Sequence, residues 1–197
     1  GNGSPDDLFV FNNSIYFTAN DGTNGTELWK SDGTQSGTVM VKDINTNYSG
    51  LNNGIKFLTL NSFFYFFANN GINGYELWKS DGTEAGTTIV KDINTGSSSS
   101  ASLLKGSLLN NIIIFEANDG INGTELWKSD GTEAGTSIVK NINNTNFNSI
   151  SYNSRYITFN NKVYFLANDD IYGTEIWKSD GTENGTSSLK DINGGNS

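Results

Sequence analysis

One decapeptide occurs four times in this 197-residue chain, and its regular spacing constrains the fold more than any other feature. The copies read GTELWKSDGT at 25–34 and 123–132, GYELWKSDGT at 74–83, and GTEIWKSDGT at 173–182. The four tryptophans lie 49, 49 and 50 residues apart: Trp29, Trp78, Trp127 and Trp177. A repeat of this length predicts a series of similar supersecondary units that bury their apolar faces against one another.

Each repeat has the pattern of four short strands. In the second copy we expect strands at 56–60, 63–68, 76–81 and 87–93, separated by Asn- and Gly-bearing turns that supply positive φ angles. The second strand, FFYFFA, is apolar on both faces, as are its counterparts IYF at 15–17, IIIF at 112–115 and VYFL at 163–166. A strand of this kind is typical of a sheet that is covered on both sides.

Four antiparallel strands in each repeat predict an all-β fold, a β-propeller with four four-stranded blades in this chain. The alternative is a linear β-solenoid. We expect blades at about 8–45, 55–94, 102–143 and 154–193 within a single repeat domain spanning 1–197. Three modes of closure remain open: four blades close alone, two chains form a homodimer that completes a ring of about eight blades, or the chain is part of a longer array. The near identity of the repeats slightly favours the homodimer.

Composition excludes several classes of function. The chain has no Cys and no His, which excludes disulfides, thiolate or imidazole catalysis, and zinc sites built on those residues. The formal net charge is −9, so we expect no nucleic-acid partner and no attraction to anionic lipid. No apolar stretch approaches the roughly 18 residues of a membrane helix, so we expect no membrane insertion. Proteins, neutral glycans and divalent cations remain open as partners.

The ELWKSDGTxxGT pattern of each repeat resembles the ELWxSDGTxxGT repeats of secreted and surface proteins from bacteria, which are often labelled hyalin-like. The resemblance covers roughly residues 8–193. It implies a propeller fold and a location outside the cell or at its surface. The motif is specific for this repeat family and says little about function.

The repeated Trp and Asp residues each have a functional and a structural interpretation. The tryptophans would stack on sugar rings in a multivalent lectin, or would pack between blades, which we favour. The aspartates of the SDGT turns (Asp32, Asp81, Asp130 and Asp180) would bind calcium, or would accept hydrogen bonds within their own turns while Gly takes a positive φ. No copy has the full spacing of a calcium loop, so we favour the turn and predict no cofactor, with calcium as the alternative.

The loops between the second and third strands are the candidate ligand-binding segments. They read NDGTNG, NNGING, NDGING and NDDIYG, and strand alternation places them beside the connectors between repeats. Their amide and carboxylate groups would hydrogen-bond a glycan or hold a cation, although turn chemistry explains the same residues. The candidate residues are Asn20, Asp21, Asn69, Asn70, Asn118, Asp119, Asn168 and Asp169.

The repeated glutamates suggest the paired carboxylates of a glycoside hydrolase, but a residue copied into every repeat points to structure instead. We expect Glu27, Glu76, Glu125 and Glu175 to form ion pairs with the fourth-strand lysines Lys42, Lys91, Lys140 and Lys190. We therefore predict no catalytic residues. The sequence favours a non-enzymatic extracellular module for adhesion, protein binding or scaffolding, with a multivalent glycan-binding lectin as the alternative and a hydrolase as a third, disfavoured one.

Overall fold

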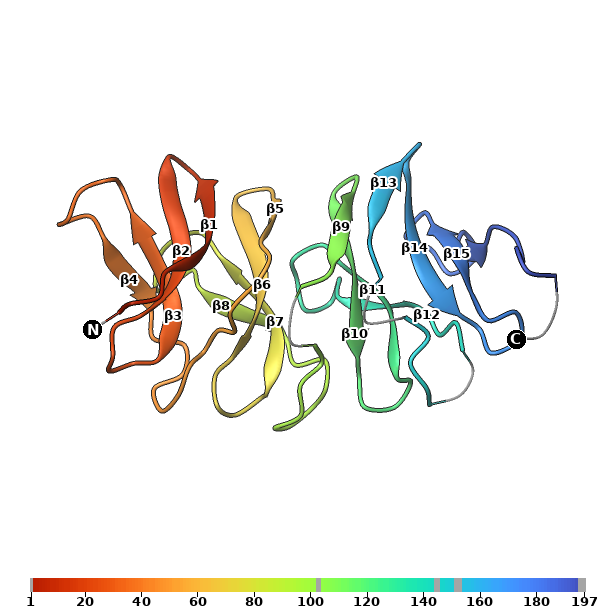
Figure 1. Cartoon of the computed structure of the whole chain (residues 1–197), viewed down its shortest axis with the longest axis horizontal. Coiled ribbons are helices and arrows are strands. Elements are labelled where there is room, and N and C mark those ends of the chain that lie inside the picture. The colour runs from red at the N-terminus through yellow and green to blue at the C-terminus, as the bar shows by residue number, and fades with distance from the viewer. Residues whose placement is uncertain (1, 102–103, 144–145, 151–153, 195–197) are drawn as a thin grey trace. The chain divides into compact units, whose positions relative to one another are not determined.

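The computed structural model describes residues 2–101, 104–143, 146–150 and 154–194 (Figure 1). In these ranges it has sixteen strands in four sheets, each a four-stranded antiparallel meander in chain order. We call the sheets blades 1 to 4. Blade 1 has β1 (Asp6–Phe11), β2 (Ser14–Asn20), β3 (Thr26–Ser31) and β4 (Val39–Lys42). Blade 2 has β5 (Leu58–Leu60), β6 (Phe63–Asn69), β7 (Tyr75–Ser80) and β8 (Thr88–Lys91).

Blade 3 has β9 (Gly106–Leu109), β10 (Ile112–Asn118), β11 (Thr124–Ser129) and β12 (Ser137–Lys140). Blade 4 has β13 (Ile157–Phe159), β14 (Lys162–Asn168), β15 (Thr174–Ser179) and β16 (Ser187–Ser188). The four strands predicted for the second repeat are confirmed to within two residues at each end. Each strand pairs with its neighbour in the same repeat, whereas a solenoid would pair strands of successive repeats, so the solenoid alternative is wrong.

The chain divides into two compact units, Gly1–Leu104 with blades 1 and 2 and Lys105–Ser197 with blades 3 and 4. A single domain over 1–197 stays a prediction, as do the blade limits. The start of the third blade predicted at 102 lies outside the described residues.

The SDGTxxGT motif forms a turn that closes on itself. In blade 2, Asp81 Oδ1 accepts hydrogen bonds from the backbone N–H and the hydroxyl of Thr83, at 2.9 and 2.7 Å. The Thr83 hydroxyl in turn accepts the N–H of Gly86 at 2.9 Å. Gly82 has a φ of +89°, and a Cβ on Gly86 would lie 2.0 Å from Asp81 Oδ1. Asp81, Gly82, Thr83 and Gly86 of the motif therefore each have a local physical cause.

The same turn occurs in the other blades, where Asp32, Asp130 and Asp180 each accept the N–H of the following threonine at 2.9 Å. These hydrogen bonds lower the pKa of Asp32 and Asp180 below the usual value, with the threonine hydroxyl as the largest cause. This is the arrangement that the turn interpretation of the aspartates expects. Among the described residues no cluster of three or more acidic side chains is placed to hold a metal ion.

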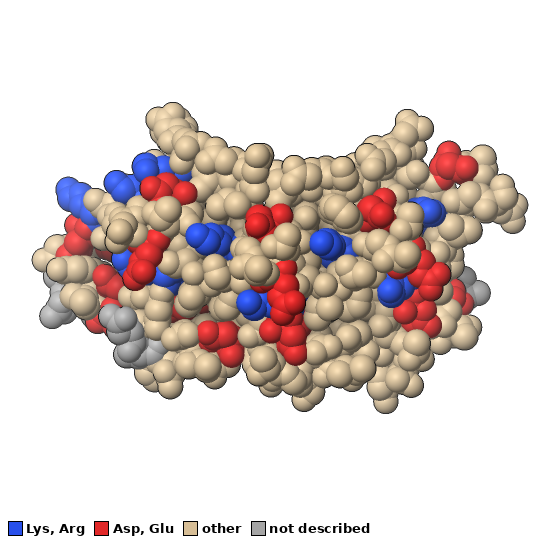
Figure 2. Space-filling model, turned by 180° about the vertical axis from the view of Figure 1, so that it is seen from behind, with Lys and Arg blue, Asp and Glu red and all other residues tan. Residues whose placement is uncertain are grey.

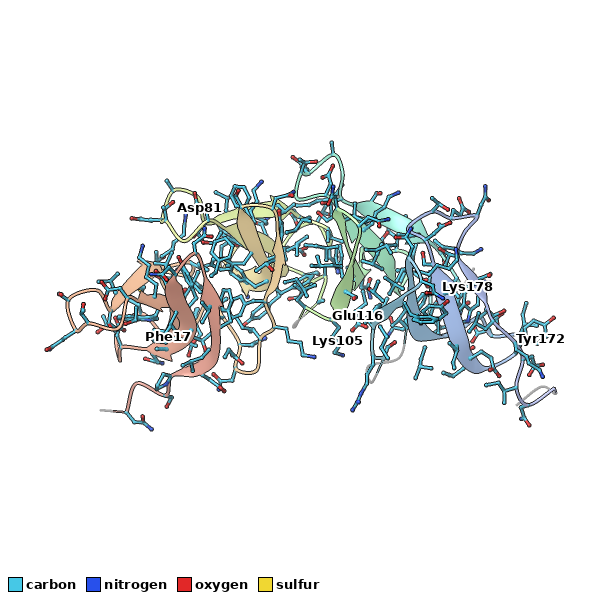
Figure 3. The ribbon with its side chains drawn as sticks, turned by 90° about the horizontal axis from the view of Figure 1, so that it is seen from above. Phe17, Asp81, Lys105, Glu116, Tyr172 and Lys178 are labelled. Carbon is cyan, nitrogen blue, oxygen red and sulfur yellow. The ribbon has the colours of Figure 1, made fainter. Side chains whose placement is uncertain are left out.

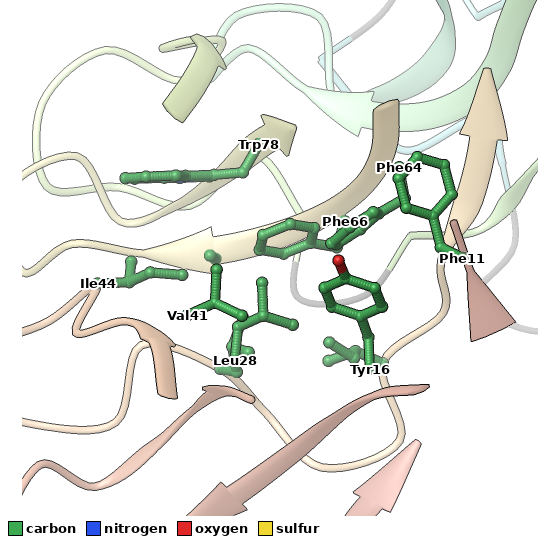
Figure 4. Packing of buried hydrophobic residues seen from close by; sticks show 11 residues of the cluster. Phe11, Tyr16, Leu28, Val41, Ile44, Phe64, Phe66 and Trp78 are labelled. Atoms are coloured by element: carbon green, nitrogen blue, oxygen red, sulfur yellow. The ribbon is translucent and has the colours of Figure 1, made fainter. Parts of the chain in front are cut away.

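The core of each unit lies in the joint between its two blades. We call the sheet face that carries the repeated Trp the leading face of a blade, and the opposite face the trailing face. In unit 1 the trailing face of blade 1 packs on the leading face of blade 2 (Figure 4). The blade 1 side has Phe9, Phe11, Tyr16, Leu28 and Val41, and the blade 2 side has Phe57, Phe64, Phe66, Trp78 and Ile89.

Aromatic rings interlock in this joint. The Phe9 and Phe57 rings stack with centroids 4.1 Å apart, and Phe11 meets Phe64 edge-on at 5.2 Å. Trp78 is 5% exposed and lies in the same cluster, so it packs between blades. The joint of unit 2 has the same construction, with Leu109, Ile114, Leu126 and Val139 from blade 3 against Val163, Phe165 and Trp177 from blade 4.

Lysines extend each joint with charge-assisted hydrogen bonds. From blade 1, the Lys30 ammonium donates to the Gly82 carbonyl at 2.9 Å, and that of Lys42 donates to the Thr87 carbonyl at 2.9 Å. In unit 2 the equivalent bonds run from Lys128 to Gly181 and from Lys140 to Thr186, both at 3.1 Å. The trailing-face lysines thus bind the SDGTxxGT turn of the next blade.

Burial of the second strand on both faces is confirmed in two repeats and wrong in the other two. Residues 64–68 of β6 and 113–117 of β10 are all buried. In β2, however, Ile15 of the leading face is 38% exposed, and in β14 Leu166 of the trailing face is 38% exposed. An apolar face is buried only where another sheet covers it, and among the described residues no sheet of the same unit covers either of these two faces.

Candidate binding surface at the loop ends of the blades

The loops that join the second and third strands turn through the same hydrogen bonds in every blade. In blade 2, Asn69 Oδ1 accepts the N–H of Gly71 at 2.7 Å. Asn70 Oδ1 accepts the N–H groups of Ile72 and Asn73, at 3.0 and 2.9 Å. These are Asx turns, in which a side-chain oxygen satisfies the backbone of its own loop.

The other six predicted ligand-binding residues make the equivalent bonds. Asn20, Asn118 and Asn168 each accept the N–H two residues ahead at 2.7 Å. Asp21, Asp119 and Asp169 each accept two successive backbone N–H groups at 2.8 to 3.0 Å. One side-chain oxygen of every candidate residue therefore already accepts a hydrogen bond within its own turn. Ligand binding by these eight residues stays a prediction.

Two of these aspartates have a depressed pKa. The N–H groups of Asn24 and Thr23 lower the pKa of Asp21. Burial raises the pKa of Asp119, but the hydrogen bonds from Asn122 and Ile121 outweigh that effect and lower it overall. Both side chains are therefore ionised at neutral pH, and they add negative charge to this surface.

In blades 1, 2 and 3 the loop packs directly on the connector that leaves its own blade. The Tyr75 N–H donates to Ser99 Oγ at 2.9 Å. Gly74 has a φ of +70°, and a Cβ there would lie 2.4 Å from the Ser98 carbonyl oxygen. Gly25 and Gly123 meet their connectors in the same way. The prediction that the loops lie beside the connectors is confirmed, and the glycine that ends each of these loops is required by this close approach.

A hollow of about 540 Å³ opens in unit 1 between the connector that follows blade 1 and the loop of blade 2. Its lining comprises Asn45, Tyr48, Ser49, Asn69, Gly71, Gly74, Tyr75 and Ser97. Tyr48 is 77% exposed. The Tyr75 hydroxyl donates to Asn52 Oδ1 at 2.7 Å, which fixes the ring at the edge of the hollow. Of the eight residues predicted from sequence, Asn69 alone lines it.

A glycine opens this hollow, and an aspartate occupies the equivalent place in unit 2. A Cβ on Gly71 would lie 3.1 Å from Asn45 Oδ1, so a larger side chain would extend into the hollow. The residue at the same position of blade 4 is Asp170, whose Oδ2 accepts a hydrogen bond from Asn143 Nδ2 at 2.6 Å. This place is thus open in unit 1, whereas in unit 2 it holds the carboxylate of Asp170.

Sequence reasoning missed Tyr48 and Tyr75. Tyr75 had a detectable signal, because the other three repeats have threonine there, at Thr26, Thr124 and Thr174. A departure from a nearly invariant repeat marks a position that is not needed for the shared fold. Tyr48 lies in a connector, where the repeats differ too much for any single residue to stand out.

The prediction that the repeated glutamates pair with fourth-strand lysines is wrong for Glu27 and Glu125. Glu27 is fully buried, and its carboxylate accepts the N–H groups of Ile44 at 3.0 Å and Gly50 at 2.7 Å. Lys42 and Lys140, their expected partners, donate to carbonyls of the next blade instead. The backbone of the connector folds over each glutamate and supplies donors that the strand pattern does not reveal.

Burial is the main influence on these carboxyl groups. It raises the pKa of Glu27, Glu76 and Glu125 to about 7, although the connector N–H groups act in the opposite direction. Glu76 accepts the Ile93 N–H at 2.9 Å, and Glu125 accepts that of Ile142 at 2.9 Å. All three are 0% exposed. They hold the connectors in place and do not face the hollow.

Both signs of charge occur on the face of the molecule that Figure 2 shows. Figure 2 shows acidic side chains interspersed with lysines on the visible face, without a continuous basic stripe. One ion pair is partly buried in unit 2, where Lys105 Nζ lies 3.2 Å from Glu116 Oε1 (Figure 3). In the part of the chain that the structure describes, no helix is long and apolar enough to cross a membrane.

Comparison with known proteins identifies the fold alone. No protein-family model matches the chain, and no curated protein matches its sequence. A puromycin hydrolase mutant is similar in structure, with a TM-score of 0.56 and 12% identity over 89% of this chain and 26% of that chain. A prolyl endopeptidase has a TM-score of 0.50 and 11% identity, over 90% of this chain and 24% of its own.

The Pyrococcus horikoshii acylaminoacyl peptidase also has a TM-score of 0.50, with 12% identity over 95% of this chain and 27% of its own. The chain thus spans about a quarter of the length of these three solved proteins. The similarity is to β-propeller domains. This chain is accordingly an all-β protein with four four-stranded antiparallel blades of the β-propeller type, as the sequence predicted.

Proposed function

We propose that this chain is a non-enzymatic binding module that takes a neutral saccharide in the hollow between blades 1 and 2. The observation that carries the proposal is the lining, which combines the rings of Tyr48 and Tyr75 with the amides of Asn45 and Asn69. Tyrosine offers an apolar ring face with a polar tip, and amides match the hydroxyl groups of a sugar. A volume of about 540 Å³ is in the range of small-ligand sites.

The charge of the chain supports a neutral ligand over an anionic one. The formal net charge is −9, and the loop of blade 1, which packs on the connector that lines the hollow, carries the ionised carboxylate of Asp21. A phosphate or nucleic acid would be repelled. Between protein contact and glycan binding, the two hypotheses left by the sequence, the tyrosine-lined hollow favours the glycan.

Catalysis is not part of the proposal. The repeated glutamates, one in each blade, are buried and accept connector N–H groups. Their burial supports a structural role over that of the paired carboxylates that flank the bond in glycoside hydrolysis. We also propose membership of the bacterial ELWxSDGTxxGT repeat family, and with it a location outside the cell or at its surface, on the basis of the repeated motif.

The test is a glycan array followed by titration calorimetry with the sugar that binds best. Tyr75→Thr restores the residue of the other repeats, and Gly71→Asp copies the residue of blade 4, so both changes are compatible with the fold. We expect each to weaken binding at least about tenfold, the effect of losing roughly 1.4 kcal/mol of contact.

The matched control is Gly120→Asp, the same change in the equivalent loop of blade 3, which leaves the hollow unaltered. It should bind like the parent chain. Absence of saturable binding across a broad array would rule out the saccharide, and equal weakening by Gly120→Asp would show that the hollow is not the site.

A further inference from the structure

Two apolar sheet faces in this chain have the residues of a blade joint but are exposed. The first is the leading face of blade 1. Val10 is 73% exposed and Ile15 is 38% exposed, whereas Phe64, the counterpart of Ile15 in blade 2, is fully buried in the joint of unit 1. Leu8, at 67% exposed, alternates with Phe9 and so shares a face with Val10.

The second is the trailing face of blade 4. Ile157 and Phe159 pair with Tyr164 and Lys162 across the sheet, which places them on this face, and they are 63% and 61% exposed. Leu189 is 47% exposed, while its counterpart in blade 1, Val41, is 6% exposed in the joint of unit 1. Blade 4 thus has the surface with which blade 1 binds blade 2, but no blade of its own unit packs on it.

The polar groups of a joint are exposed at the same two faces. In both joints, trailing-face lysines donate to the SDGTxxGT turn of the next blade. The corresponding lysines of blade 4 are Lys178 (labelled in Figure 3) and Lys190, which make no such bond within the described chain. On blade 1 the corresponding acceptors are the carbonyls of Gly33 and Thr38.

The turn of blade 1 is correspondingly uncovered. A Cβ on Gly82, in blade 2, would collide with the Tyr16 side chain, whereas one on Gly33 would meet no atom within 4 Å. Thr38 is exposed, and its counterparts Thr87 and Thr136 are 0% and 1% exposed. The donors and apolar groups at the end of blade 4 therefore match the acceptors and apolar groups at the start of blade 1.

We propose that the trailing face of blade 4 binds the leading face of blade 1 in a second copy of the chain, and that two such joints close a symmetric pair with eight blades. The template is the joint that the chain already makes between blades 1 and 2 and again between blades 3 and 4. Lys178 then donates to the Gly33 carbonyl of the other copy, and Lys190 to that of Thr38. Closure of the pair covers both apolar faces of each copy, which an open chain of copies would leave exposed at its ends.

The test is the mass in solution, measured by light scattering and sedimentation over a range of concentrations. The parent chain should have twice its chain mass of 21.3 kDa. Val10→Glu and Phe159→Glu each place a charge in both joints of the pair and should give monomers. Ile121→Glu, at a loop residue that is 69% exposed and belongs to neither face, should leave the pair intact.

Mixing the two variants tests the head-to-tail geometry. Val10→Glu retains an intact trailing face on blade 4, and Phe159→Glu retains an intact leading face on blade 1, so the mixture can form one joint where neither variant alone can form any. We expect the mixture to recover dimers, at least tenfold weaker than the parent. A monomeric parent at about 100 µM, a larger open assembly, or dimers in each single variant would overturn the proposal.

Discussion

The blades of unit 1 are expected to depend on the joint between them, and Phe64→Ala tests that dependence. Phe64 is 0% exposed, and its ring lies within 6 Å of five other rings, those of Phe9, Phe11, Tyr16, Phe57 and Phe66. Replacing a buried phenylalanine with alanine typically lowers the free energy of unfolding by about 3–5 kcal/mol, through lost burial and the cavity that remains. Because the neighbours are rings held from both sheets, they have little freedom to collapse into the gap, and we expect the upper half of that range.

The assay is urea unfolding followed by tryptophan fluorescence, since Trp78 belongs to the same cluster. With a urea slope of about 2 kcal/mol per molar, a loss of about 4 kcal/mol lowers the midpoint of unit 1 by roughly 2 M. Phe147→Ala is the matched control, because Phe147 is 72% exposed and lies outside both joints. A loss below about 1 kcal/mol for Phe64→Ala, or an equal loss for Phe147→Ala, would refute the reasoning that packing between blades stabilises the unit.

Two further outcomes follow from buried groups of the repeats. Burial raises the pKa of Glu27, Glu76 and Glu125 to about 7, so these groups bind protons more tightly in the folded chain than in the unfolded chain. Their contribution to stability is therefore greatest below about pH 4.5 and declines as the pH rises towards 7. Melting temperatures measured from pH 5 to pH 8 should therefore fall, less steeply for Glu76→Gln, and a rise over this range would contradict the raised pKa. Gly74→Ala should destabilise unit 1 by more than about 1 kcal/mol in the same urea assay, because the new methyl group would meet the Ser98 carbonyl and because φ is +70°. Gly54 has a φ of +76° with open space around it, so Gly54→Ala should cost only the smaller free energy of placing alanine at a positive φ.

The fold was predictable because the residue types within each repeat determine its own strands and turns. Asn61 takes a φ of +56° at the turn between β5 and β6, and Gly82 takes +89° in the SDGT turn, as their residue types suggest. Strand alternation was enough to place Trp78 on one face of its sheet. Such local rules cannot identify the hydrogen-bond partner of a side chain when that partner comes from a later segment of the chain.

That limit explains the error over the glutamates and the incomplete prediction of the site. Glu27 lies on a strand, and the groups that satisfy it come from a connector about 17 to 23 residues further along the chain. The hollow likewise forms where the connector of one blade meets the loop of the next, so Tyr48 and Tyr75 come together only in the folded unit. The exposed faces of blades 1 and 4 were missed because a repeat looks the same whether or not a neighbour follows it.

The loops that turn through their own Asx side chains have a consequence for how such a protein can diversify. Asn69 and Asn70 already satisfy the backbone around them, Asn73 donates to Asp92 of the connector at 2.7 Å, and Gly74 packs on the connector. Within the loop, the exposed positions 71 and 72 are therefore the ones that can vary. Residues 71 and 75 already differ between blades while the strands on either side are retained. Each blade can therefore acquire a new recognition surface by a few point changes, independently of the others, and a library that varies only these positions would preserve the scaffold.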